Sequence, residues 1–446
     1  MNVTVALEHR FLRKPDGTVW TDGPFGYSFF SRYLTVFDSV RVAARVTDET
    51  DSPGHLIRAG GAGVSFLPLP YYVGPAQYLR RSWSLCRAAQ SAVRAADAVI
   101  LRVPSQVAIS VANALGKAGH PFGLEVVGDP YDAFAPGSHS HPLRALFRWH
   151  HARQLRRQCH QACCVSYVTE RALQERYPAQ KNAFATYYSS VELPPAAFVQ
   201  NPRNYCESRD GESRDGESRD GESQDGAPRD GEPNRDEPHK PFRLISVGSL
   251  EHLYKGPDTL IEAMALCARK GLDLQLTLAG DGRRRPELEA LAARHGLQEK
   301  VRFSGQCPPG SAVRDLLDQA DLFVLASRQE GVPRAMIEAM ARALPAVGTH
   351  AGGIPELLPS QCRVPADDPL RLARMLGELA ASGQRLASMS QRNLAKARDY
   401  AEERLQPRRD ALYRHLSEQT QAWKRRRVSV ATLGFAGWAK GISRSS

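Results

Sequence analysis

Two glutamates in the second half of the chain could bind hydroxyl groups of a ligand. Glu330 lies just before a stretch that Pro333 is well placed to open as a helix, and Glu338 lies on that stretch. At about 100° of rotation per residue, Glu338 lies roughly 140° from the middle of the helix's apolar stripe. A carboxylate there can reach the paired hydroxyls of a ribose, and one in the preceding loop can reach those of a sugar. For each glutamate taken alone, an ordinary surface residue is the favoured interpretation.

An earlier loop combines a lysine with the expected start of a helix. The loop GSLEHLYKGPD covers residues 248–258, and Lys255 and Gly256 directly precede Pro257, which would open the helix. Free N–H groups at the start of a helix attract anions, and a flexible cation beside them favours a diphosphate. A surface lysine in an ordinary loop would show the same local pattern.

Two further segments carry glycines where a strand is expected to end. Gly280 and Gly282, in the loop AGDG, permit close approach of the backbone to a ligand, although the loop could also be a simple tight turn. The segment VRFSGQ, residues 301–306, is expected to form a strand and turn beside a nucleobase.

Short β-type runs alternate with longer helical stretches in both halves of the chain. Apolar β-runs separated by helices indicate parallel sheets with helices on both faces, and two such series predict two doubly wound, Rossmann-like α/β domains. The loops above follow strands at the carboxyl edge of such a sheet, where ligands bind. The strand candidates are 3–7, 40–46, 98–103, 123–127 and 164–167 in the first half, and 244–247, 274–279, 301–304, 322–326 and 346–348 in the second.

A repeat separates the two halves. From Glu207 the pentamer ESRDG occurs three times and then decays, in a segment with one alanine as its only anchor for a core. This composition predicts a disordered linker. We therefore predict an N-terminal domain over residues 1–195, a linker over 196–240, a second domain over 241–400, and a C-terminal helix with a basic tail over 401–446.

Composition narrows the classes of partner. The 446 residues, 42% hydrophobic and 24% charged, are typical of a globular protein, without a run of about 18 apolar residues or a recognisable signal peptide. The eight cysteines lack framework spacing, which indicates reduced thiols and a cytoplasmic protein. The net charge of +11 favours phosphate-bearing substrates or an anionic membrane surface over nucleic acid, because no nucleic-acid module is recognisable.

As an ordered set, the motifs of the second half resemble a known family. The pattern E-x7-E within EGxPxxxxEAMA, followed by a small-residue strand and GGxPEL, is similar to the signature of the retaining family-four glycosyltransferases, within glycosyl transferases group 1. The KG loop, the AGDG loop and the VxFxG strand precede it in the family's order. The resemblance covers about residues 242–415. It implies the GT-B fold, in which two Rossmann-like domains face each other across a cleft, with no catalytic metal and no separate cofactor.

The resemblance also implies roles for residues on the donor side. Lys255 would contact the diphosphate of a nucleotide-sugar donor, Glu330 with the backbone of Gly331 and Val332 would hold the transferred sugar, and Glu338 would hold the ribose. The loops at Gly248 and Ser249, and at Gly280 and Gly282, would complete the donor site.

One residue departs from the family's pattern. Many members carry an arginine where this chain has Ser249. The phosphate charge would then be met by Lys255, by the start of a helix, or by another base such as Arg283 or Arg334.

The first half would handle the acceptor and resembles the family less closely. Its glycine-containing segment Gly23–Tyr27 is the nearest candidate for the family's glycine-rich loop. Asp129, at the end of the strand LEVVG, is the expected catalytic residue of this half, with Glu125 and Asp132 as alternatives. A turn-forming aspartate before a proline would explain Asp129 equally well.

Two basic segments suggest an anionic acceptor or membrane contact. Residues 141–160 contain five arginines, four histidines and no acid, and the end of the chain contains the run WKRRR at 423–427, with Phe435 and Trp438 beyond it. Either segment could serve anionic lipid headgroups, although a solvated helix end is the favoured interpretation of the second.

Taken together, these patterns predict a retaining, metal-independent transfer of a sugar from a nucleotide-sugar donor to an acceptor. The favoured acceptor is a lipid-linked or polysaccharide precursor, met at the inner face of the membrane. The alternatives are a GT-B sugar-nucleotide epimerase or phosphorylase, or an inactive GT-B scaffold. A nicotinamide-dependent oxidoreductase is disfavoured because no GxGxxG motif follows a strand.

Overall fold

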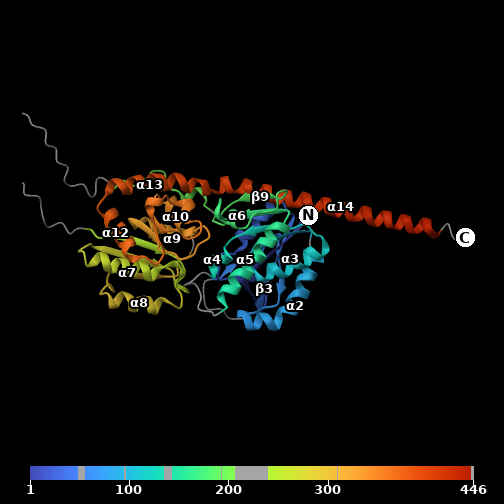
Figure 1. Ribbon diagram of the computed structural model, residues 1–446, viewed down its shortest axis with the longest axis horizontal. Coiled ribbons are helices and arrows are strands. Elements are labelled where there is room, and N and C mark those ends of the chain that lie inside the picture. The colour runs from blue at the N-terminus through green and yellow to red at the C-terminus, as the bar shows by residue number, and fades with distance from the viewer. Residues whose placement is uncertain are drawn as a thin grey trace, which may run out of the picture.

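The computed structural model shows two α/β domains and a long C-terminal helix that leaves the second domain and runs along the first (Figure 1). None of the helices described combines the length and the apolar character that a membrane crossing requires. The described residues are 1–48, 56–94, 97–134, 143–191, 193–205, 240–308 and 310–442.

The first domain is built on a nine-stranded sheet whose central part is parallel. The parallel strands, in spatial order, are β5 (Val64–Leu69), β3 (Ser39–Asp48), β1 (Asn2–Arg13), β6 (Ala98–Val103), β7 (Gly123–Val126), β8 (Cys164–Tyr167) and β9 (Phe184–Tyr187). An antiparallel extension beyond the far end of β1 consists of β2 (Val19–Thr21) and β4 (Ile57–Arg58).

The second domain contains a six-stranded sheet in which every pair is parallel. Its strands, in spatial order, are β12 (Val301–Gly305), β11 (Leu274–Ala279), β10 (Phe242–Val247), β13 (Leu322–Leu325), β14 (Ala346–Thr349) and β15 (Arg363–Val364). The predicted doubly wound α/β class is therefore confirmed.

Helices cover both sheets. The first domain contains α1 (Tyr27–Ser31), α2 (Gly74–Arg94), α3 (Gln106–Ala118), α4 (Pro130–Ala133), α5 (Arg144–Gln161) and α6 (Ala172–Arg176). The second contains α7 (Pro257–Ala268), α8 (Arg285–Arg294), α9 (Ser311–Asp318), α10 (Arg334–Ala341), α11 (Ile354–Leu357), α12 (Pro369–Ala380) and α13 (Gly383–Ala397), and α14 (Glu402–Ile442) ends the fold.

The sequence of β6 and α3 shows how the fold arises locally. All six residues of β6, AVILRV, are buried, as in a strand covered on both faces. The side chain of Ser105 accepts a hydrogen bond from the N–H of Ala108 and caps the start of α3. Gly119, in the left-handed conformation at φ 59°, ends that helix.

The ten predicted strands all occur, nine of them within two residues of their expected ends, whereas β1 continues six residues past its predicted end at Leu7 and β2, β4, β5, β9 and β15 were not predicted. The missed strands are short or carry partly exposed residues, so their sequences lack the continuous apolar run of a central strand.

The first part of the segment predicted as a linker is packed on the second domain. Leu193, Ala197 and Tyr205 lie in the core of the second domain, and Arg203 donates hydrogen bonds to the carbonyls of Ala320 and Arg342. Residues 196–205 of the predicted linker are thus packed against that domain, and residues 206–239, with the repeat, lie outside the described residues.

The last helix completes the core of the first domain. Leu405, Leu412, Tyr413 and Leu416 of α14 pack with β1 and β3 on one face of the first sheet. Further along, the ring of Trp423 lies 4.3 Å from that of His120, and Lys424 pairs with Asp97. Trp423 and Lys424 therefore contact the first domain. The side chains of Phe435 and Trp438, and residues 443–446, lie outside what the structure describes.

Candidate active site between the two domains

A cavity of about 390 Å³ lies between the two domains. The second domain contributes the loop after β13, with Arg328 and Glu330, and the loop after β14, with His350 and Gly352. The first domain contributes the loops that follow β7 and β8. The carboxyl edges of the two parallel sheets thus face each other across the cavity, as expected for a ligand site in this fold class.

Glu330 and Lys255, which are distant in the sequence, form a close pair beside this cavity. The Nζ atom of Lys255 lies 2.6 Å from Oε1 of Glu330, and the hydroxyl of Ser327 donates to the same oxygen at 2.7 Å. The side chain of Glu330 is 5% exposed and that of Lys255 is 21% exposed. A lysine and a carboxylate held in this way form a charged centre that a diphosphate and sugar hydroxyls can each engage.

Gly256 allows the lysine loop to approach β13. Its φ is 69°, and a Cβ atom there would lie 2.0 Å from the carbonyl oxygen of Ala326. Only glycine fits so close a contact. Gly256 therefore holds the loop where Lys255 meets Glu330, while the backbone of Gly248 lies along the lysine side chain.

The AGDG loop packs against the loop that follows β10. Gly280 has a φ of 148°, and a Cβ atom on it would lie 1.9 Å from the carbonyl oxygen of Gly248. A Cβ atom on Gly282, at φ 157°, would lie 2.2 Å from the backbone nitrogen of Glu251. The structure thus brings together the segments containing Gly248, Ser249, Gly280 and Gly282, as a packed pair of loops.

The glycines after β14 close over the glutamate loop. Gly352 has a φ of 50°, and a Cβ atom there would lie 1.8 Å from the carbonyl oxygen of Glu330. The N–H of Gly353 donates to the carbonyl of Gly331 at 2.7 Å. Gly331 itself faces the carbonyl of Val127 in the first domain, and Val332 beside it is buried.

Glu338 lies half-buried on α10, whereas Met336, Ile337 and Met340 face the core of the second domain. Burial raises the pKa of the Glu338 carboxyl, and the nearby Arg334 and Arg314 offset this only in part. The predicted separation of Glu338 from the apolar stripe is therefore found. Glu338 is not among the residues that line the 390 Å³ cavity.

On the side of the first domain, Asp129 and Asp132 both line the cavity. Asp129 caps α4 by accepting the N–H of Tyr131 at 2.8 Å, and it also accepts from the hydroxyl of Tyr177 at 2.5 Å and from Arg176. Asp132 pairs with Arg176 at 3.0 Å. Burial and the neighbouring carboxylate of Asp129 raise the pKa of Asp132, and Arg176 counters this only partly.

Two other candidates of the first half lie elsewhere. Glu125 is buried in the core, where it is paired with Arg102 and accepts a hydrogen bond from Tyr33. In the segment Gly23–Tyr27, Gly23 lies against the ring of His9 and Gly26 against Ile57. Neither Glu125 nor the segment Gly23–Tyr27 lines the cavity.

Several cavity residues were not predicted from the sequence. Arg328 pairs with Asp258 at 2.8 Å and with Asp367 at 2.6 Å, and Arg176 joins the two aspartates of the first domain. Arg283 and Arg334, which the sequence suggested as further cations, do not line this cavity. The described residues hold no group of three or more His, Cys, Asp or Glu placed to bind a metal ion.

Comparison with known proteins agrees with this architecture. Residues 241–382 match the family model "Glycosyl transferases group 1". The chain is 22% identical to Protein CapJ of Staphylococcus aureus over 360 residues, which is 81% of this chain and 82% of CapJ. It is 34% identical over 151 residues to the amylovoran biosynthesis glycosyltransferase AmsK of Erwinia amylovora, a match that covers 32% of this chain and 37% of AmsK.

Solved structures extend the likeness to the whole fold. Anabaena HepE in complex with UDP and glucose superposes with a TM-score of 0.59 at 16% identity, covering 92% of this chain and 98% of HepE. The second domain therefore matches the glycosyl transferases group 1, and the two domains together have the GT-B fold.

Proposed function

We propose that the protein transfers a sugar, with retention at the anomeric carbon, from a nucleotide-sugar donor to a glycan or glycolipid precursor. The observation that carries this proposal is the Lys255–Glu330 pair, which is held beside a cavity between the two domains. The relatives add support, since AmsK is named for amylovoran biosynthesis and HepE was solved with UDP and glucose.

A bound donor would separate the two charges of this pair. Its diphosphate would replace Glu330 as the partner of Lys255, and Glu330 would accept hydrogen bonds from hydroxyls of the transferred sugar. The backbone at Gly331 and Val332 would line the sugar, and Glu338 would accept the ribose hydroxyls. The glycine loops at Gly248, Ser249, Gly280 and Gly282 would let the nucleotide approach the backbone.

Catalysis would rest mainly on charge stabilisation. The bond between the anomeric carbon and the diphosphate breaks with its electron pair going to the leaving group, and Lys255 stabilises that developing charge. Because this positive charge comes from the protein itself, we propose that no metal ion is needed, and activity in the presence of a chelator tests that step.

On the acceptor side we propose Asp129 as the residue of the first domain that serves the reaction. Its oxygens are already engaged by Tyr177 and Arg176, so it would act together with Asp132. The raised pKa of Asp132 suits a group that receives a proton from an acceptor hydroxyl.

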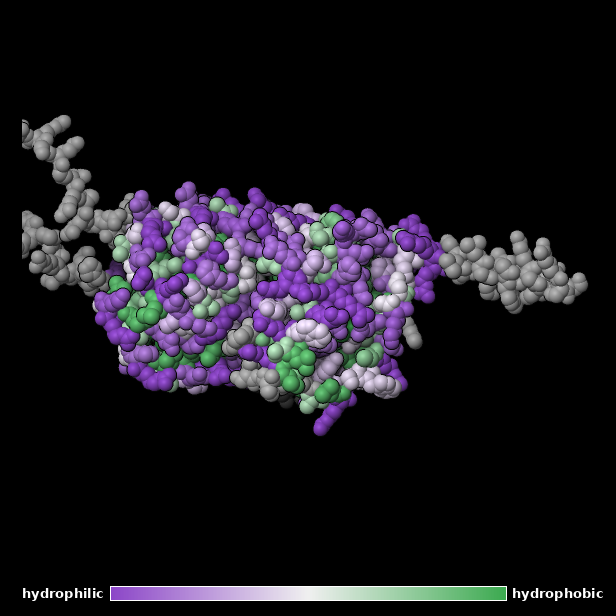
Figure 2. Space-filling model, viewed as in Figure 1, coloured by the Kyte–Doolittle hydropathy of each residue, from purple (hydrophilic) through white to green (hydrophobic). Residues whose placement is uncertain are grey.

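A peripheral position at the inner face of the membrane is also proposed. Large apolar side chains are exposed on α2 and at the start of α5, among them Leu79, Trp83, Leu143, Leu146 and Trp149. Figure 2 shows hydrophobic residues, in green, gathered at the lower edge of the first domain. Arginines flank these side chains on both helices, an arrangement that suits anionic headgroups.

The proposal is tested by release of nucleoside diphosphate from a panel of nucleotide sugars. We expect one donor to be hydrolysed slowly without acceptor, and Glu330→Ala to lower that rate by at least about a hundredfold, the scale of losing a transition-state contact. The matched control is Glu289→Ala, which removes an exposed carboxylate of α8 and should leave the rate unchanged. Near-normal hydrolysis in a folded Glu330→Ala variant would contradict the assignment, and nucleotide binding without any turnover would favour an inactive GT-B scaffold.

A further inference from the structure

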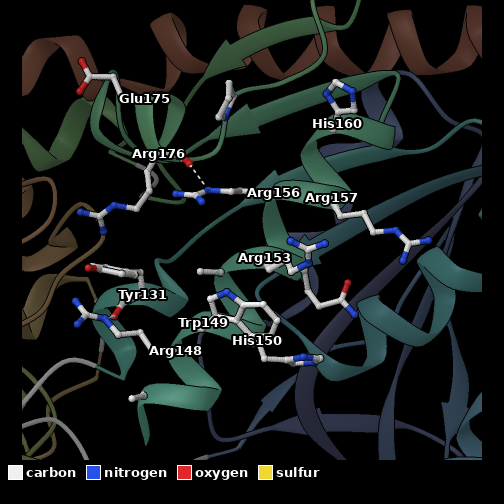
Figure 3. Close-up of a pocket in the computed structure, with 14 residues that line it drawn as sticks. Tyr131, Arg148, Trp149, His150, Arg153, Arg156, Arg157, His160, Glu175 and Arg176 are labelled. Atoms are coloured by element: carbon white, nitrogen blue, oxygen red, sulfur yellow. Dashed lines mark hydrogen bonds between the residues drawn. The ribbon is translucent and has the colours of Figure 1, made fainter.

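A hollow of about 1020 Å³ lies on the first domain, separate from the cavity at Glu330. It lies between α4, α5 and α6 (Figure 3). Among the described residues, its lining includes a single carboxylate, that of Glu175, and five arginines, which are Arg148, Arg153, Arg156, Arg157 and Arg176. We call this hollow the arginine groove.

Two of these arginines are held by stacking on one aromatic ring. The guanidinium carbon of Arg148 lies 3.4 Å from the ring centre of Tyr131, and that of Arg176 lies 4.8 Å from it. Figure 3 shows the tyrosine between the two guanidinium groups. Stacking of this kind orients a planar cation before any ligand arrives.

Two of the groove's arginines are anchored through Nε. The Nε–H of Arg148 donates to the carbonyl of Tyr131 at 2.8 Å, and that of Arg156 donates to the carbonyl of Arg176 at 3.1 Å. Both bonds spare the terminal nitrogens, which are the atoms that bind a phosphate in a two-pronged manner.

Most of the groove's positive charge is not neutralised within the described part of the chain. Arg176 is paired with Asp129 and Asp132. By contrast, Arg148, Arg153, Arg156 and Arg157 form no ion pair with a carboxylate of a described residue. Several like charges on one concave surface repel one another unless an anion binds between them.

The groove adjoins the proposed reaction site. Arg176 lines both the arginine groove and the cavity that contains Glu330, and Tyr131 and Asp132 lie within one turn of each other on α4. An anion in the groove would therefore place the rest of the same molecule at the cavity, next to Asp129 and Asp132.

From this arrangement we propose that the arginine groove binds a phosphate or diphosphate group of the acceptor. The inference rests on the proposed transferase function and specifies its acceptor as an anionic, phosphorylated molecule. Leu146 and Trp149, at 53% and 59% exposure, lie beside the arginines on α5 and offer apolar surface to a lipid chain attached to that phosphate.

The test uses inorganic pyrophosphate as the probe and isothermal titration calorimetry on the full chain. Lys255→Ala serves as the background, because it removes the other proposed diphosphate site. In that background Arg153→Gln with Arg157→Gln should weaken pyrophosphate binding by at least about tenfold, the loss of one charge-assisted contact. Both side chains are exposed, so the variant should fold. The matched control is Arg371→Gln on α12, whose side chain is 70% exposed.

Pyrophosphate affinity that is unchanged in the Arg153/Arg157 variant would overturn the proposal, as would the absence of measurable binding. Donor hydrolysis, measured in the protein with Lys255 intact, distinguishes a wrong assignment of the arginine groove from a wrong assignment of the transferase function. If the groove fails alone, hydrolysis persists and still depends on Glu330.

The same titration separates the two sources of phosphate. A lipid-linked acceptor is identified if farnesyl diphosphate binds more tightly than pyrophosphate and if Trp149→Ser removes this difference in affinity. If glucose 6-phosphate binds at least as tightly as farnesyl diphosphate, the acceptor is identified as a soluble sugar phosphate. In either case the Arg153→Gln/Arg157→Gln change must weaken the binding.

Discussion

At the scale of single residues, the proposed donor site contains two carboxylates, Glu330 and Glu338, whose surroundings differ. Glu330 is bound by a lysine and a serine hydroxyl, whereas Glu338 is half-buried with two arginines as the main source of stabilising charge. Only an ionised carboxylate can accept a hydrogen bond from each of two ribose hydroxyls through both oxygens. The protonation of Glu338 should therefore control donor affinity.

Donor binding is expected to weaken on acidification. Burial raises the pKa of Glu338, so this carboxyl takes up its proton at a higher pH than an ordinary glutamate. Measured between about pH 8 and pH 5, the range above ordinary glutamate titration, donor affinity should fall toward acid in the natural protein and stay nearly level in Glu338→Gln. Parallel pH profiles for the two proteins would show that Glu338 does not contact the donor.

At the scale of elements, α11 connects the loop that contains Glu330 and Gly331 to the first domain. The carboxylate of Glu356 accepts hydrogen bonds from the N–H groups of Glu170, Arg171 and Ala172, at 2.5, 3.0 and 2.9 Å. The start of α11 is tied in turn to the glutamate loop by the bond from Gly353 to Gly331. Three bonds to one charged group make this a specific contact between the two domains.

Loss of this contact should let the domains separate more readily. We expect Glu356→Ala to lower kcat on the order of tenfold, because bonds to a charged group contribute about 1.5–3 kcal/mol and domain closure completes the site. The radius of gyration from small-angle X-ray scattering should rise. Glu378→Ala on α12, which removes a carboxylate that is 51% exposed, is the control. An unchanged kcat together with an unchanged radius would refute the role of Glu356.

At the scale of the whole molecule, Glu125 joins distant parts of the chain in the core of the first domain. It pairs with Arg102 and lies 3.6 Å from Arg32, and it accepts hydrogen bonds from Tyr33, Tyr188 and, on α14, Tyr413. Burial opposes its ionisation, but the two guanidinium groups and the hydrogen bonds from Tyr33 and Tyr188 together outweigh that effect and lower its pKa. The charge therefore helps to hold α14 on the first sheet.

Removing this charge should destabilise the protein by about 3–5 kcal/mol, because the buried Arg102 would lose its counter-charge. Urea unfolding of Glu125→Gln measures the effect, and Glu287→Gln, at an exposed pair on α8, should change the free energy of unfolding by less than about 1 kcal/mol. Because the folded-state pKa of Glu125 is lowered, its stabilisation is present above the ordinary glutamate pKa and is lost as pH falls through the lowered value. The difference between the two proteins should therefore shrink in acid, and a difference that does not depend on pH would contradict this account.

Much of this molecule could be predicted from local sequence. The apolar runs of β6, β10 and β13 predict buried parallel strands because a strand covered on both faces needs apolar residues at every position. The glycines and prolines that end strands and open helices mark the loops of the donor side, and they do so through backbone conformations that depend on neighbouring residues alone.

Tertiary structure decided which of these residues meet. Four contacts join segments that are far apart in the chain. Glu330 pairs with Lys255, Arg176 lines two cavities, Glu356 of the second domain binds N–H groups of the first, and Tyr413 donates to Glu125. Glu125 and Asp129 look alike in sequence, yet one lies in the core and the other lines the cavity. Periodicity and turn chemistry act over a few residues and determine the elements, whereas packing of whole sheets and helices determines the distances between side chains, and those distances decide the chemistry.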